Sequence, residues 1–164
     1  MRHVKLYGFG QVGKGIVSSL MKRSIDEVTV FDIDAERVEG HLLDYQQSSF
    51  FNPHPVKLHV GRPDTPVMKD DLHIITAGVP RAKGQTRLDL LQSNKDVVAG
   101  ICRRIHEQNP TAFVFIVTNP VDVLTQVALN HSRWSRSHIF GSGTVLDSAR
   151  FRYFISQEMG VDVK

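Results

Sequence analysis

The sequence contains a single cysteine, Cys102, among its 164 residues. An intramolecular disulfide is therefore excluded, which fits a reducing compartment such as the cytoplasm. The amino-terminal stretch MRHVKLYGFG lacks the apolar core that a secretory signal carries. No uninterrupted apolar run approaches the roughly 18 residues that a membrane span requires. We therefore expect a cytoplasmic protein that has no membrane partner.

A strong excess of either charge is also missing. The 20 lysine and arginine residues nearly balance the 17 aspartate and glutamate residues, and the formal net charge is +3. So small an excess can favour an anionic ligand but does not by itself indicate nucleic acid. The residues that a nucleic-acid surface could use are scattered among acids and are better explained as solvated faces: Arg103, Arg104, Arg133, Trp134 and Arg136. We predict no nucleic-acid partner.

Metal-ligand spacing is absent from the eight histidines, and we predict no metal site. Internal repeats and low-complexity tracts are absent as well. The length suits one domain, and a hydrophobic content of 41% is that of an ordinary globular protein.

Short apolar segments alternate with segments of helical periodicity along the chain. The expected strands are residues 3–7, 27–31, 55–60, 72–76, 112–117 and 138–141. The expected helices are residues 11–22, a helix capped by Asp34, a long helix ended by residues 109–110, and helices starting near Val121 and Thr144. Apolar strands separated by helices predict an α/β fold, a doubly wound parallel six-stranded sheet with helices on both faces.

The first two expected helices carry apolar residues at helical spacing, as does the long third helix. In the first, one face is expected to hold Val12, Ile16, Val17 and Leu20. In the second, the spaced residues are Val38, Leu42 and Tyr45. In the third, they are Leu88, Leu91, Val98, Ile101 and Ile105.

Four glycines crowd into KLYGFGQVGKG, residues 5–15, although glycine costs about 0.5–1 kcal/mol relative to alanine inside an element. Gly8, Gly10 and Gly13 fit the pattern G-x-G-x-x-G between an expected strand and an expected helix, which is the context that dinucleotide binding requires. Gly8 would permit the tight turn, Gly10 would let a pyrophosphate approach the backbone, and Gly13 would let the helix pack on the strand. The amino end of the helix would then face the phosphates.

Asp32 supplies the second half of this pattern. It ends the second expected strand, 19 residues after Gly13. A carboxylate there accepts hydrogen bonds from the adenosine ribose and repels a 2′-phosphate, which favours NAD over NADP. Either Asp32 or Asp34 could instead cap the following helix. We assign the cap to Asp34 and the ribose to Asp32.

Four further stretches follow in order: DIDAERVEGHLLD (32–44), ITAGVPRAKGQTRLDLLQSN (75–94), VTNPVD (117–122) and GSGTVLDSARFR (141–152). Together with the glycine loop they resemble the L-lactate/malate dehydrogenase family over essentially the whole chain. The resemblance implies an NAD-binding Rossmann fold, NAD as cofactor and NAD-dependent oxidoreductase activity on a small 2-hydroxy or 2-oxo acid. It also implies a homo-oligomer, a dimer or tetramer.

The same resemblance implies roles for individual residues. Arg87 would polarise the substrate carbonyl, Asn119 would lie near the substrate oxygen and the nicotinamide, and Arg150 would grip the substrate carboxylate. Asp147 would orient a catalytic histidine. The residues implied to contact the cofactor are Gly8, Gly10, Gln11, Val12, Gly13, Asp32, Ala77, Gly78 and Asn119.

Simpler explanations exist for each of these residues taken alone. Arg87 and Arg150 could be solvated surface arginines, Asp147 a first-turn helix acid, and Asn119 a turn residue before a proline. Their joint occurrence in family order favours the functional interpretation.

Arg81 bears on the substrate. It occupies the loop position that reads the substrate side chain in the family, where arginine is usual in malate enzymes and glutamine in lactate enzymes. The arginine favours malate and oxaloacetate, whereas VLDSARFR is closer to the lactate branch, so lactate and pyruvate follow closely. Arg81 could also be simply an exposed loop residue.

The sequence departs from the family in one respect. A Gly-Glu-His-Gly-Asp motif, which carries the catalytic histidine of the family, does not occur in these 164 residues. We therefore expect residues 1–143 to form the dinucleotide-binding domain and residues 144–164 to begin a helix leading into a substrate domain. By themselves the 164 residues are expected to be inactive as a dehydrogenase. The alternative is a non-catalytic NAD-binding module.

Overall fold

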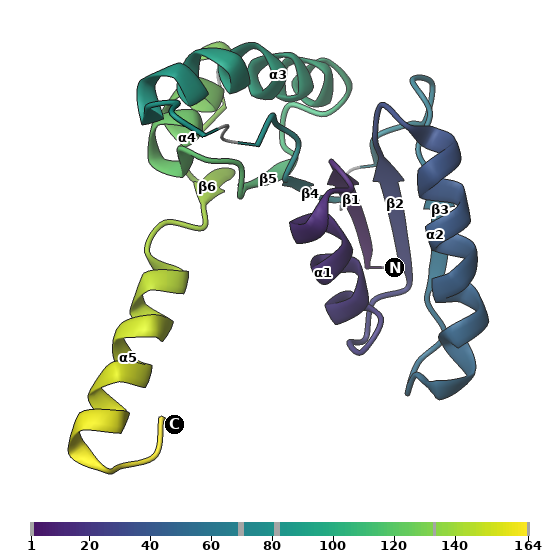
Figure 1. The fold of residues 1–164 in the computed structure, drawn as a ribbon. Coiled ribbons are helices and arrows are strands. Elements are labelled where there is room, and N and C mark those ends of the chain that lie inside the picture. The colour runs from purple at the N-terminus through teal and green to yellow at the C-terminus, as the bar shows by residue number, and fades with distance from the viewer. Residues whose placement is uncertain (1, 69–70, 81–82, 133, 164) are drawn as a thin grey trace.

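A computed structural model describes residues 2–68, 71–80, 83–132 and 134–163. At its centre lies a wholly parallel sheet of six strands in the order β3-β2-β1-β4-β5-β6 (Figure 1). The strands are β1 (His3–Tyr7), β2 (Glu27–Phe31), β3 (Lys57–Val60), β4 (Leu72–Ile75), β5 (Phe113–Ile116) and β6 (Ile139–Gly141). The predicted α/β architecture and its six strands are confirmed. The strand order reverses between β1 and β4, which is where open α/β sheets bind ligands.

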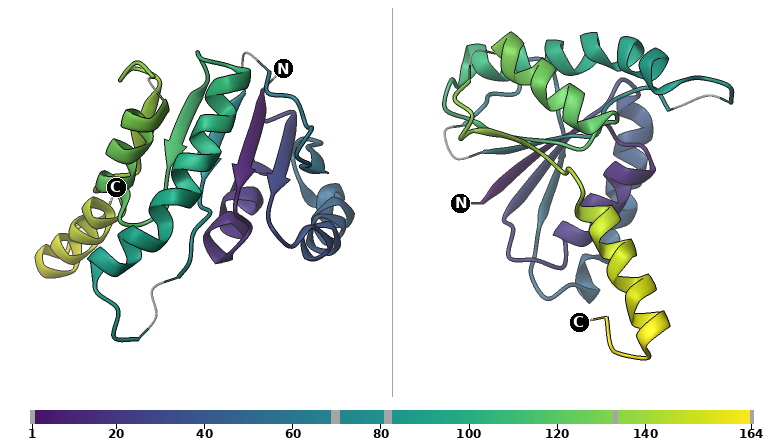
Figure 2. Two further views of the ribbon diagram at one scale, coloured as in Figure 1. Left: turned by 90° about the horizontal axis from the view of Figure 1, so that it is seen from above. Right: turned by 90° about the vertical axis from the view of Figure 1, so that its left-hand side faces the viewer.

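Five α-helices and one short 3-10 helix connect these strands in the described part of the chain. They are α1 (Gln11–Leu20), α2 (Ala35–Gln47), η1 (Ser48–Phe51), α3 (Arg87–Gln108), α4 (Val121–Ser132) and α5 (Val145–Met159). α1 and α2 cover one face of the sheet, and α3 and α4 cover the other (Figure 2). Asp34 caps α2 as predicted, because its Oδ1 accepts a hydrogen bond from the Arg37 N–H at 3.1 Å.

Each face of the sheet buries its own apolar cluster. Successive residues of a strand point to opposite faces, so neighbouring residues belong to different clusters. On β1, Val4 and Leu6 pack with Val17 of α1, whereas Tyr7 packs with Val98 of α3. Val12 and Leu88, which helical spacing groups with the buried residues of α1 and α3, are 57% and 73% exposed. Both lie in the first turn of their helices.

Element ends also differ slightly from expectation. α1 stops at Leu20, two residues early, and β3 starts at Lys57 rather than residue 55. η1 was not anticipated, because SSFF carries no helical periodicity.

A cluster of buried polar side chains lies on the α3 face of the sheet. Lys5, in the middle of β1, is fully buried, and its Nζ is 2.9 Å from Asp71 Oδ2. Beside this pair His73 is also fully buried, and its Nδ1 is 3.1 Å from the Tyr7 hydroxyl. Burial lowers the pKa of His73 to about 3 and raises the pKa of Tyr7. His73 is therefore a neutral packing residue of the folded protein near pH 7.

Helix α5 leaves the body of the molecule and extends away from the sheet (Figures 1 and 2). Ser156 is its only buried residue among those described. Large apolar side chains line it and remain at least 38% exposed: Val145, Leu146, Phe151, Tyr153, Phe154, Ile155 and Met159. Of the helices described, none is long and apolar enough to cross a membrane.

Candidate dinucleotide-binding site

The glycine loop lies at the carboxyl end of β1, where it turns into α1. Gly8 has a positive φ of 99°, and a Cβ there would lie 2.6 Å from the Ala77 Cα. A Cβ on Gly13 would collide with the Gly8 carbonyl oxygen and lie 3.3 Å from Thr76 Oγ1. The turn and the close helix–strand packing predicted for Gly8 and Gly13 are therefore features of the structure.

Gly10 is different, because a Cβ built on it would meet no described atom within 4 Å. Gly10 is the N-cap of α1, which has no capping side-chain hydrogen bond and no acidic residue in its first turn. The first N–H groups of a helix have no partner within the helix, and together they favour an anion. The open space at Gly10 therefore fits a phosphate group that approaches the amino end of α1, where Gln11 and Val12 also lie.

Asp32 follows β2 and is bound to the glycine loop. Its Oδ2 accepts a hydrogen bond from the Phe9 N–H at 2.6 Å, and its Oδ1 accepts one from the Asp34 N–H at 3.1 Å. The Phe9 ring is fully buried and lies edge-on to Tyr45 of α2, with ring centroids 6.5 Å apart. The structure thus brings the predicted carboxylate and the predicted glycine loop together.

Ala77 and Gly78 follow β4 on the other side of Gly8. The Thr76 hydroxyl donates to the Gly8 carbonyl at 2.7 Å, which joins this segment to the glycine loop. Beyond it, buried Asn94 of α3 accepts a hydrogen bond from the Val79 N–H at 2.7 Å and donates to the Asn119 carbonyl at 3.0 Å. Gly8, Ala77, Gly78 and Asn119 therefore form one continuous edge along the carboxyl ends of β1, β4 and β5.

Sequence reasoning assigned no role to Phe9, Asn94 or Arg37, although all three lie within the quoted motifs. Asn94 in particular connects Val79, 15 residues before it, with Asn119, 25 residues after it. A polar residue at a buried position of a long amphipathic helix is the signal that could have identified it.

The residues predicted to contact the substrate are less completely described. Arg81 lies outside the described residues. Arg87 is the first residue of α3, whose start is fixed by a capping box in which Thr86 and Asp89 bind each other's backbone N–H groups. Hydrogen bonds from the side chain and backbone of Thr86 hold the pKa of Asp89 below its usual value.

Asp147 and Arg150 lie on exposed α5 and pair with each other, with Nη1 and Oδ1 separated by 3.2 Å. One turn of helix brings them to the same face. Within the described residues neither makes a hydrogen bond or ion pair with the glycine loop or with Asn119.

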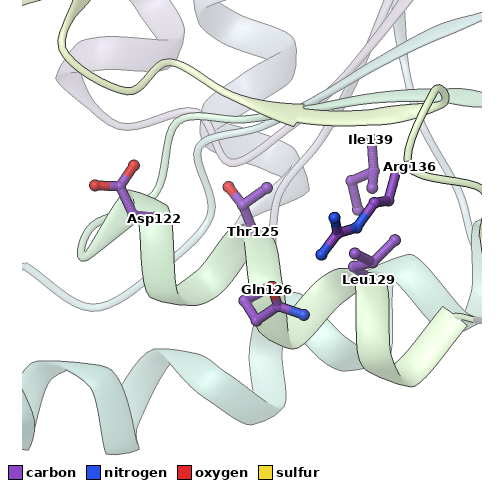
Figure 3. A pocket seen from close by; sticks show the side chains of 6 residues that line it. All are labelled: Asp122, Thr125, Gln126, Leu129, Arg136 and Ile139. Atoms are coloured by element: carbon purple, nitrogen blue, oxygen red, sulfur yellow. The ribbon is translucent and has the colours of Figure 1, made fainter.

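The described surface includes the following hollows. One, of about 250 Å³, lies between α4 and β6, and Figure 3 shows the side chains around it: Asp122, Thr125, Gln126, Leu129, Arg136 and Ile139. It contains none of the predicted site residues. Another, of about 700 Å³, runs beside α2 and β3 and reaches Asp32 at one end.

The residues considered for nucleic acid are partly used inside the fold. Trp134 is buried, and Arg104 lies 5.6 Å from the Phe31 ring and donates to the carbonyls of Arg62 and Pro63. Arg133 lies outside the described residues.

Comparison with known proteins gives a consistent result. Residues 2–141 match the family model described as lactate/malate dehydrogenase, NAD binding domain. The L-lactate dehydrogenase of Treponema denticola is 40% identical over 164 residues, which cover 99% of this chain and 51% of that protein. The L-lactate dehydrogenase of Zea mays is 37% identical over 162 residues, 98% of this chain and 46% of that protein.

Comparison with solved structures leads to the same family. The minor L-lactate dehydrogenase of Enterococcus mundtii in its ligand-bound form superposes with a TM-score of 0.87 at 30% identity, covering 99% of this chain and 52% of that one. A lactate dehydrogenase from a Medee basin deep-sea metagenome library gives a TM-score of 0.85 at 32% identity with the same coverage. The chain thus spans about half the length of the curated relatives that it matches.

Proposed function

The chain belongs to the lactate/malate dehydrogenase family as its NAD-binding domain, and we propose that it serves an enzyme that interconverts a small 2-hydroxy acid and its 2-oxo acid. Its cofactor is NAD. The observation that carries the proposal is the junction of Asp32 with the glycine loop at 2.6 Å, beside the open amino end of α1. This arrangement suits two parts of the adenosine diphosphate: Asp32 suits the adenosine ribose, and the amino end of α1 suits the pyrophosphate.

NAD supplies the hydride acceptor, or as NADH the hydride donor, and the residues of this chain would bind and orient it. The amino end of α1 would face the pyrophosphate across Gly10, with Gln11 and Val12 beside it. The Asp32 carboxylate would accept from the adenosine ribose hydroxyls. The nicotinamide end would lie along Ala77, Gly78 and Asn119. Asn94 would hold the backbone of Asn119 in place.

Three residues would then act on the substrate. Arg87 would hold positive charge against the carbonyl oxygen, where negative charge develops during hydride transfer. Arg150 would grip the carboxylate with its planar fork of N–H donors. Asp147 would orient a catalytic histidine supplied from outside these 164 residues. Asp147 and Arg150 contact each other at 3.2 Å, and the remaining N–H donors of the guanidinium stay available for a substrate carboxylate.

We place the boundary of the dinucleotide-binding domain at residues 143–144. Helix α5 follows at Val145 and, apart from Ser156, its described residues are exposed, among them several large apolar side chains; exposed apolar patches of this kind mark contacts with other polypeptide. This surface supports association with further polypeptide, and we propose that the enzyme is a homo-oligomer. Cytoplasmic location remains a proposal that rests on the single cysteine.

Arg81 favours oxaloacetate and malate as substrates, because a guanidinium can pair with a second carboxylate. The printed names of the matched relatives, L-lactate dehydrogenases, favour pyruvate and lactate as the second candidate. A chimera that joins residues 1–164 to the carboxyl-terminal half of the Treponema denticola enzyme would test both. We expect it to oxidise NADH with oxaloacetate faster than with pyruvate, and Arg81→Gln in the same chimera to shift the ratio of kcat/KM towards pyruvate.

An unchanged ratio in Arg81→Gln would refute the role of Arg81, while leaving dehydrogenase activity established. Residues 1–164 alone should bind NADH without measurable turnover, because general acid–base catalysis contributes about 10²–10⁴-fold and positioning contributes more. Robust turnover by this polypeptide would refute the assignment of the catalytic histidine to another part of the enzyme. A chimera that folds and binds NADH but reduces neither acid would favour a non-catalytic NAD-binding module.

A further inference from the structure

Arg37, in the first turn of α2, lies between the carboxylates of Asp32 and Asp34, which follow β2. Its Nη2 is 3.4 Å from Asp32 Oδ1, and its Nε donates to Asp34 Oδ2 at 3.2 Å. The guanidinium is thereby held beside the carboxylate proposed to bind the adenosine ribose. It has five N–H donors in a rigid fork, and 42% of the side chain is exposed, so it can still reach a ligand.

The negative charge of Asp32 is correspondingly shared among several hydrogen-bond donors. Its side chain is only 11% exposed, and it accepts from the Phe9 N–H at 2.6 Å as well as from the Asp34 N–H. An unpaired carboxylate at this position repels a 2′-phosphate, which is why an acid here selects NAD. A carboxylate paired with a guanidinium repels it less.

We propose that Arg37 reads the 2′ position of the adenosine ribose, weakening the repulsion by Asp32 and offering a guanidinium to a 2′-phosphate, so that NADPH binds this chain as a weaker second cofactor. The inference rests on the dinucleotide site proposed above. Guanidinium groups suit phosphate because two parallel N–H donors match two of its oxygens. Arg37 is thus a specificity residue that moderates the preference set by Asp32.

Isothermal titration calorimetry of residues 1–164 with NADH and with NADPH tests this. In Arg37→Ala the dissociation constant for NADPH should rise about tenfold, which corresponds to about 1.4 kcal/mol, while that for NADH changes less than about twofold. Arg23→Ala is the matched control, because Arg23 is also exposed but precedes β2 at the opposite end of the strand. It should leave both affinities unchanged.

A double-mutant cycle sharpens the test. Asp32→Asn keeps an oxygen that can accept from the Phe9 N–H but removes the charge and releases Arg37. NADPH should then bind more tightly than it binds the unmodified chain, and adding Arg37→Ala should remove the part of that gain that the released guanidinium supplies. Raising the salt concentration should weaken NADPH binding more than NADH binding, because the contact with the phosphate is ionic.

Three results would overturn the inference. NADH and NADPH affinities that fall equally in Arg37→Ala would mean that Arg37 only positions Asp32. NADH binding without any NADPH binding at millimolar concentration would mean that Asp32 discriminates fully despite Arg37. A chain that binds neither nucleotide would refute the dinucleotide site itself, and this inference with it.

Discussion

Phe9 and Asp32 come from different strand ends, yet the backbone N–H of Phe9 donates to the Asp32 carboxylate at 2.6 Å. The hydrogen bond joins the two parts of the proposed cofactor site. Because the Phe9 ring is simultaneously buried against α2, the glycine loop is anchored from both sides. The loop can therefore present its free N–H groups without having to be ordered by a ligand.

Gly13 and Gly15 provide a matched pair within α1. Gly13→Ala would push a methyl group into the Gly8 carbonyl, and we expect the free energy of unfolding to fall by about 1–3 kcal/mol. Gly15→Ala meets open space in the same helix, and we expect it to stabilise the protein by about 0.5–1 kcal/mol. Urea titration of both variants measures the difference. Equal effects would contradict the packing described for Gly13.

The stability of the protein should depend on pH through His73. Burial lowers its pKa from 6.5 in the unfolded chain to about 3 in the folded one. Between these values the unfolded chain binds a proton that the folded protein does not, so stability is fully present above about pH 6.5 and is lost as the pH falls. The pKa of His3 is also lowered by burial, and its contribution has the same sign.

His73→Gln should reduce this slope by an amount on the order of 1 kcal/mol per pH unit between pH 4 and 6. Denaturant unfolding at a series of pH values, with wild type and variant side by side, makes the comparison. A slope identical in the two proteins would show that His73 protonates as easily in the folded state as in the unfolded state.

Helix α5 should drive self-association of residues 1–164. Its exposed side chains include Phe151 and Phe154, 67% and 66% exposed, and apolar patches of several hundred Å² favour contact between molecules. Light scattering should detect a dimer or larger species, and Phe151→Ser with Phe154→Ser should lower the apparent mass. A monomer at high concentration before any substitution would contradict this expectation.

Much of the fold could be predicted from the sequence because its parallel strands are buried on both faces and read as continuous apolar segments. The glycine loop, Asp32 and the cap at Asp34 were predictable because each depends on local geometry at the end of one strand. The contacts of Asn94 and Phe9 join segments that lie 15 to 25 residues apart in the sequence, and no local pattern specifies their partners. The contacts of Arg37 span only three to five residues, but they depend on the conformation of an exposed side chain, which the sequence pattern does not specify. The burial of Lys5 was also unpredictable, since a buried lysine is tolerable here because Asp71 and the Pro66 carbonyl approach it from another segment.

Binding of NADH to Gly10→Val tests most directly whether the dinucleotide crosses the glycine loop. A Cβ at Gly10 meets no described atom within 4 Å, so we expect Gly10→Val to fold, with a thermal midpoint lowered by no more than the cost of replacing one exposed glycine. The valine would nevertheless occupy the space proposed for the pyrophosphate. Calorimetry should show at least tenfold weaker NADH binding than in the unmodified chain. A folded Gly10→Val that binds NADH as tightly as the unmodified chain would contradict the account.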